Sequence, residues 1–116
     1  MPNQIAQLDR VFQALADPTR RAVLERLSGG PAPTLELARP FDMALPSFTQ
    51  HLGVLEKCGL VKSKKTGRVR TYELAPQPLQ AAEDWMTDRR KLWERRLDQL
   101  DAYLLTMKEN DDDDEE

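Results

Sequence analysis

The chain has 116 residues, of which 40% are apolar and 32% charged, a composition typical of one globular domain. No apolar run approaches the roughly 20 residues needed to span a bilayer, and the first residues lack the basic-then-apolar plan of a signal peptide. These features argue against a membrane or exported protein. The single cysteine, Cys58, allows no internal disulfide, so we expect a cytoplasmic protein.

The formal net charge of -3 comes from one end of the chain. Residues 111–116 carry six of the 20 acidic residues, and the other 14 face 17 Lys and Arg, which leaves the body at +3. We therefore expect one folded domain over residues 1–110 and a disordered acidic tail at 111–116.

The first half of the chain predicts three helices. Apolar residues recur at three- and four-residue steps from Ile5 to Leu15 and predict an amphipathic helix over 4–16. Asp17 suits an N-cap and Pro18 the first helical position, so a second helix begins there and ends at residues 28–31. Thr34 can cap a short third helix over 35–39.

The middle of the chain predicts a fourth helix followed by a hairpin. Phe48, Leu52 and Leu55 are spaced by four and three and form the expected core face of a helix over 45–57. Gly59 fits the left-handed position that closes it. Strands are expected at 61–65 and 69–74, joined by a turn at Gly67.

A final helix is expected over 79–108, after Pro76 and Pro78 break the chain. The predicted fold is mainly α with a small β-hairpin, in the order α-α-α-α-β-β-α. A helix followed by a basic hairpin is typical of the winged helix-turn-helix, a fold that holds duplex DNA.

The outer face of helix 45–57 carries short polar side chains that can reach base edges. Gln50 can pair bidentately with adenine, Thr49 can meet a base or a phosphate, and Ser47 and His51 flank them. The alternative is that these residues only solvate an exposed helix face.

The hairpin over 61–74 has a run of cations without an acidic residue between Glu56 and Glu73. Such a wing can contact phosphates or enter the minor groove. Lysines also protect exposed sheet edges from aggregation, but that account does not explain two arginines just past the tip. The candidate wing residues are Lys62, Lys64, Lys65, Arg68 and Arg70.

The last helix has an apolar stripe at heptad spacing, from Met86 to Met107 and interrupted at Arg90. We expect Trp85 and Leu79 to cover the protein's own core. The remainder of the stripe exceeds what a small core can bury and predicts a two-fold dimer interface with the first helix. The interface residues are expected to be Leu8, Phe12, Trp93, Leu97, Leu100 and Leu104.

Three ordered segments resemble the ArsR-type family of bacterial winged-helix repressors. They are Asp17-Pro18-Thr19-Arg20-Arg21, residues 46–61 from Pro46-Ser47-Phe48 to Gly59-Leu60-Val61, and the wing from Gly67-Arg68 to Leu74. The resemblance covers most of residues 5–110. It implies a cytoplasmic homodimeric repressor that reads an inverted-repeat operator in double-stranded DNA.

The chain departs from the metal-sensing members of that family. Pro33-Thr34-Leu35 stands where sensors of one type carry Cys-x-Cys, and the last helix has no histidine. One Cys and one His cannot supply the converging ligands that zinc or arsenic requires, so we expect a metal-free member without a cofactor. A second departure is Ala44, which cannot cap the fourth helix; Asp42 could compensate.

The sequence also bears on other classes of function. No nucleophile–base set, glycine-rich phosphate loop or carboxylate pair indicates an enzyme. A protein-interaction module on the same scaffold and a non-specific DNA-coating protein remain alternatives, and a pure protein binder would not need the basic wing. The operator, the regulated genes and any small-molecule effector stay open, as does a role for the acidic tail in competing with DNA for the wing.

Overall fold

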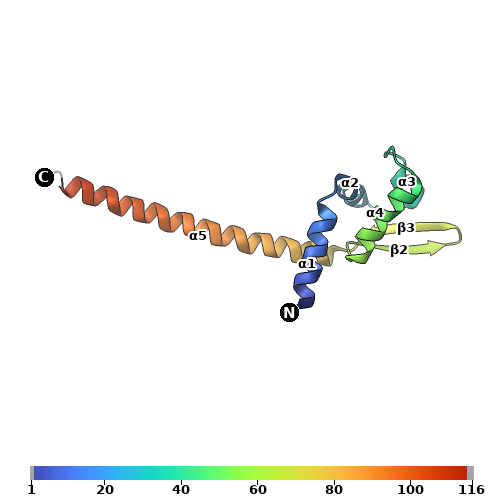
Figure 1. Cartoon of the computed structure of the whole chain (residues 1–116), viewed down its shortest axis with the longest axis horizontal. Coiled ribbons are helices and arrows are strands. Elements are labelled where there is room, and N and C mark those ends of the chain that lie inside the picture. Colours follow the sequence, from blue (N-terminus) through green and yellow to red (C-terminus); the bar gives the residue numbers. More distant parts are fainter. Residues whose placement is uncertain (1, 115–116) are drawn as a thin grey trace. The chain divides into compact units, whose positions relative to one another are not determined.

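The computed structural model describes residues 2–114, with side chains for residues 5–110. It divides into two compact units, one ending at Ala82 and one beginning at Glu83. The elements are α1 (Pro2–Leu15), α2 (Pro18–Leu27), β1 (Ala32–Pro33), α3 (Thr34–Ala38), α4 (Leu45–Lys57), β2 (Val61–Thr66), β3 (Val69–Leu74) and α5 (Pro76–Asp114) (Figure 1). This order confirms the predicted winged helix-turn-helix.

Two helix ends follow the predicted chemistry. The Asp17 carboxylate accepts a hydrogen bond from the Arg20 backbone N–H at 3.0 Å, which satisfies one of the free donors at the start of α2. At the end of α4, Gly59 has a φ of +81°. Its N–H donates to the Glu56 carbonyl and the N–H of Leu60 donates to the Leu55 carbonyl, the two bonds of a Schellman motif.

The sheet contains one strand that the sequence did not predict. In the described residues its order is β1-β3-β2, with both pairs antiparallel. Pro33 in β1 pairs with Thr71 of β3, at the edge of the sheet, where proline is tolerated. The Thr34 hydroxyl donates to the Arg70 carbonyl at 3.2 Å, whereas Pro33 is the N-cap residue of α3 and makes no side-chain capping bond. The prediction of Thr34 as a cap was therefore wrong.

The core lies where the helices meet the sheet. Phe48, Leu52 and Leu55 are fully buried, as predicted for the inner face of α4. In α1 the buried positions are instead Val11 and Ala14, and the stripe that begins at Ile5 is only partly covered. The side chains that pack partly against the core include Leu8, Phe12, Leu15, Phe41, Leu74 and Leu79.

The last helix departs from prediction at both ends. It begins at Pro76, because the first helical turn needs no N–H donors and accepts both Pro76 and Pro78. Its backbone stays helical to Asp114, beyond the predicted end at 108. The side chains of 111–116 lie outside the described residues, so the disordered acidic tail stays a prediction.

Trp85 corrects another expectation. Leu79 packs against the core as predicted, but Trp85 keeps 45% of its surface exposed. The Arg89 guanidinium lies 5.6 Å from the centre of its ring, in a cation–π arrangement.

Among the described residues, no helix is long and apolar enough to cross a membrane.

Candidate nucleic-acid interface

The outer face of α4 is open and polar. Phe48, Leu52 and Leu55 are fully buried on the inner face of α4, and on its outer side Ser47, Thr49 and Gln50 are exposed. The Thr49 hydroxyl donates to the Pro46 carbonyl at 2.9 Å, which leaves its oxygen lone pairs available. No side chain caps α4 at Ala44, so the expected compensation by Asp42 is wrong.

His51 is less open than predicted. Its ring Nδ1 lies 3.1 Å from Arg20 Nη1 and 3.6 Å from Asp17 Oδ2, and about a quarter of its side chain is exposed. A guanidinium can only donate, so Nδ1 accepts, and the proton of the neutral ring lies on Nε2. One edge of His51 is thus held by the start of α2, and the other presents a donor.

Arg20 connects three helices, a role that the sequence did not predict. Its Nε donates to the Ala14 carbonyl at 2.9 Å and its Nη2 to the Gln13 carbonyl at 3.0 Å. These carbonyls belong to the last turn of α1, where helices lack internal donors. The hydrogen bond from the Arg20 N–H lowers the pKa of the Asp17 carboxyl below its usual value, and the Arg20 guanidinium acts in the same direction.

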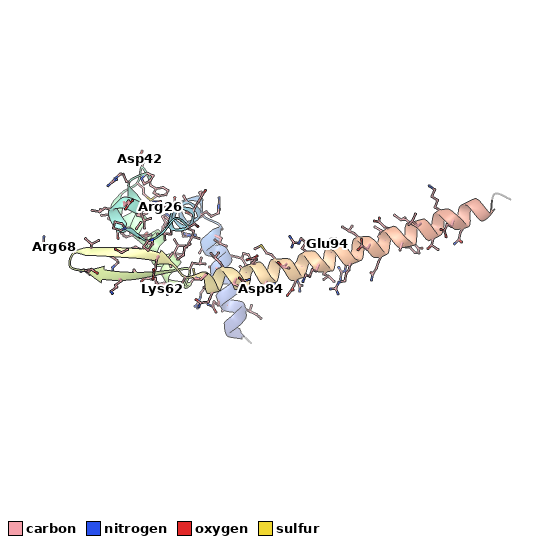
Figure 2. All side chains as sticks on the ribbon, turned by 180° about the vertical axis from the view of Figure 1, so that it is seen from behind. Arg26, Asp42, Lys62, Arg68, Asp84 and Glu94 are labelled. Carbon is pink, nitrogen blue, oxygen red and sulfur yellow. The ribbon has the colours of Figure 1, made fainter. Side chains whose placement is uncertain are left out.

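The wing ends in a two-residue turn formed by Gly67 and Arg68. Gly67 has a φ of +63° and Arg68 does not have a positive φ, as in the type II′ turn that favours glycine at its first position. Figure 2 shows Arg68 at the tip of the hairpin. The predicted turn at Gly67 is confirmed.

The strand register separates the predicted wing cations into two faces. Lys65 lies opposite Arg70, on the face shared with Ser63 and the buried Tyr72. On the other face, Lys64 lies opposite Thr71. Lys62 lies opposite Glu73 there, nearer the base of the hairpin (Figure 2). From the sequence alone, these cations were predicted to form one cluster.

The Lys65 face of the wing is joined to α4 by hydrogen bonds that the sequence did not reveal. The Ser63 hydroxyl donates to Glu56 Oε1 at 2.6 Å, and Arg70 Nη1 donates to Ser63 Oγ at 2.8 Å. Burial raises the pKa of the neighbouring Tyr72, and the Glu56 carboxylate adds to that effect. Arg70, predicted to contact DNA, therefore has a partner within the chain.

The remaining reactive side chains form no centre of their own. Cys58 is buried, and its thiol donates to the Leu55 carbonyl. In the part of the chain that the structure describes, no group of three or more His, Cys, Asp or Glu residues is placed to hold a metal ion. The helix α4 lies beside the hairpin of β2 and β3 (Figure 1). An exposed helix face beside a basic hairpin is the architecture of winged helix-turn-helix DNA-binding proteins.

Comparisons with known sequences agree with this class. A family model described as a helix-turn-helix domain matches residues 15–64. The chain is 45% identical to the HTH-type transcriptional regulator Rv2034 of Mycobacterium tuberculosis, over 77% of this chain and 80% of that protein. It is 33% identical to the transcriptional repressor SdpR of Bacillus subtilis, over 68% of this chain and 88% of that protein.

Solved structures narrow the assignment. The crystal structure of the ArsR family transcriptional regulator RHA00566 matches with a TM-score of 0.73 and 53% identity, over 81% of this chain and 94% of that one. A homodimeric winged helix-turn-helix DNA-binding domain from Mycobacterium bovis matches with a TM-score of 0.60 and 26% identity, over 76% and 83%. The chain belongs to the ArsR family of transcriptional regulators, which are DNA-binding proteins and not enzymes.

Proposed function

We propose that this chain is a homodimeric repressor that binds an inverted-repeat operator through α4 and the wing. The observation that carries the proposal is the exposed Ser47, Thr49 and Gln50 face of α4, whose opposite face is fully buried. A helix fixed in this way can enter the major groove without losing its packing.

Within this proposal, α4 reads bases and the wing binds the backbone. The Gln50 amide pairs bidentately with an adenine, and Ser47, Thr49 and the Nε2 edge of His51 contact neighbouring bases or phosphates. The exposed wing cations neutralise phosphates and supply affinity without sequence choice. The predicted wing contacts are Lys62, Lys64, Lys65, Arg68 and Arg70.

The dimer is supported by the exposed apolar stripe of α5 and by the homodimeric M. bovis domain. Trp93, Leu97, Leu100 and Leu104 are each more than half exposed. Pairing two copies of the stripe removes this surface from water, with Leu8 and Phe12 of α1 joining the interface. The two copies of α4 then lie about one helical turn of DNA, or roughly 34–36 Å, apart.

Repression follows from occupancy, since a dimer seated on promoter DNA excludes other proteins from it. The similarity to SdpR, which is named a transcriptional repressor, supports this direction of control. We further propose that the protein acts in the cytoplasm, as its single cysteine led us to expect. We also propose that it acts without a metal, because its single Cys and single His cannot supply a sensor's ligand set.

The test is selection of bound sequences from a pool of random duplexes near physiological salt. The proposal predicts enrichment of one sequence that binds more tightly than a shuffled duplex of equal length across a salt series. Equal, steeply salt-dependent binding to both would indicate a DNA-coating protein. No binding would favour a protein-interaction module.

Two variants separate base reading from backbone binding. Gln50→Ala should relax the choice at one base pair, a loss of about 1–3 kcal/mol in discrimination. Arg68→Ala should weaken binding to all sequences and flatten the salt dependence. Equal losses on enriched and shuffled duplexes for both variants would refute this division of roles.

A further inference from the structure

Three side chains from three elements form one continuous bridge between the helix α4 and the wing. Glu56 lies in the last turn of α4, Ser63 in β2 and Arg70 in β3. The Ser63 hydroxyl donates to Glu56 Oε1 at 2.6 Å and accepts from Arg70 Nη1 at 2.8 Å. We call these three residues the wing bridge.

The two hydrogen bonds of the wing bridge can run in only one direction, from Arg70 to Ser63 and from Ser63 to Glu56. A carboxylate has no proton to donate and a guanidinium has no acceptor, so they cannot exchange roles. A serine hydroxyl has one proton and free lone pairs, and it links the two with a charge-assisted bond on each side. Replacing Ser63 by alanine removes both bonds, whereas threonine retains the hydroxyl that makes them.

The wing bridge lies where the hairpin leaves the core. Val61 and Tyr72 are buried and Ser63 is half-buried, but every residue from Lys64 to Arg70 is exposed. Ser63 and Tyr72 face each other across the strands. Among the described contacts, the wing bridge is thus the side-chain link to α4 that lies nearest the exposed end of the hairpin. It supplements the backbone connection between α4 and β2, which passes through Gly59.

We propose that Ser63 and Arg70 are positioning residues that fix the angle of the wing against α4, and that Arg70 is not a phosphate contact. The inference rests on the proposed function and revises one residue of it. Arg68 at the tip and Lys65 have no such internal bond among the described contacts and supply phosphate binding. Arg70 is instead held by Ser63, which is bound in turn to Glu56 of α4.

Salt dependence on the enriched duplex distinguishes the two roles of arginine. Arg68→Ala should reduce the slope of log K against log salt by about 0.9, the value for one lost phosphate contact. Arg70→Ala and Ser63→Ala should each weaken binding about 3- to 10-fold without changing the slope, because either substitution breaks the wing bridge. The double variant should lose no more than either single one, and Ser63→Thr should bind like the wild type.

A second measurement works without DNA. Backbone ¹⁵N order parameters of residues 64–70 should fall in Ser63→Ala and Arg70→Ala and stay unchanged in Arg68→Ala. A slope change of about 0.9 in Arg70→Ala, or unchanged order parameters in Ser63→Ala, would overturn the inference. Failure of the wild type to prefer the enriched duplex would contradict the proposed function instead, and the order parameters would still decide the role of the wing bridge.

Discussion

The region up to Ala82 and the region from Glu83 onward differ in how far their apolar side chains are buried. Every buried apolar side chain in the described part of the chain lies at or before Ala82. Beyond it, Trp93 is 64% exposed and Leu97, Leu100 and Leu104 are each just over 50% exposed. The first region buries a core of its own, whereas the large apolar side chains of the second are mostly exposed.

The difference assigns distinct tasks to the two regions. The first region has a core on which α4 is fixed, and a helix that reads DNA must be held in this way. The second repeats its apolar residues at heptad spacing on a helix, a pattern that is stabilised by a partner helix. Under the proposed function, the first region reads DNA and the second sets how two reading elements are spaced.

The largest expected effect is the weakening of the proposed dimer by Leu97→Ala. Each buried leucine contributes about 1.5–3 kcal/mol, and two-fold symmetry counts it twice, so the dissociation constant of the dimer should rise roughly 10²- to 10⁴-fold. Sedimentation equilibrium measures this. Leu105→Ala is the control, because it lies about 120° from the stripe and is 62% exposed. A similar loss in both variants would contradict the interface.

Phe48→Ala should show that the first region depends on its own core. Phe48 is fully buried and its ring centre lies 5.3 Å from that of Phe41. The free energy of unfolding should fall by about 3–5 kcal/mol. Urea denaturation at one protein concentration measures the loss. Leu35→Ala, at a position 69% exposed in the same region, should change it by less than about 0.5 kcal/mol.

Asp17→Ala should cost about 0.5–2 kcal/mol of unfolding free energy, because α2 loses its N-cap. Folding lowers the pKa of Asp17 below its usual value, mainly through the hydrogen bond from the Arg20 N–H, so the contribution of Asp17 to stability is complete above the pKa of the unfolded chain. It is lost as the pH falls through the lower folded-state pKa. The gap between wild type and variant should therefore narrow on acidification. Asp17→Asn, which can still cap, should be closer to the wild type at neutral pH.

The smallest effect is expected in the second region, at Arg90. Its Nε lies 3.9 Å from Glu94 Oε1, and both side chains are largely exposed. Arg90→Ala should change the free energy of unfolding by no more than about 0.5 kcal/mol. The change should disappear in about 1 M salt, where such pairs are screened. A larger effect that persisted in salt would place Arg90 in a packed interface.

The sequence predicted the elements that are defined by local rules. The bounds of α4 and β3 were predicted correctly, because apolar spacing and Gly59 determine where α4 ends and the turn at Gly67 determines where β3 begins. The strand β1 was missed since two residues, one of them Pro33, form a strand only by pairing with β3. The start of α5 was predicted too late because prolines were taken as breaks and not as first-turn residues.

The exposed helix face that the proposal uses was predicted, but its contacts with the rest of the chain were not. The exposed polar face of α4 follows from helical spacing alone. The contacts of Arg20 with the end of α1, and the wing bridge, join residues from separate elements by side-chain hydrogen bonds. Such contacts leave no periodic signal in a sequence. They changed the interpretation of His51 and Arg70, which had been assigned to DNA from their positions in the helix and the wing.

The most direct test of the account is the symmetry of the DNA that the wild-type protein selects. Two reading regions joined by a dimeric second region should enrich two inverted half-sites, with centres about 10–10.5 base pairs apart or a multiple of that distance. Two chains should bind each duplex, and Leu97→Ala should abolish the tight two-site complex. Enrichment of a single half-site bound by one chain would contradict the account.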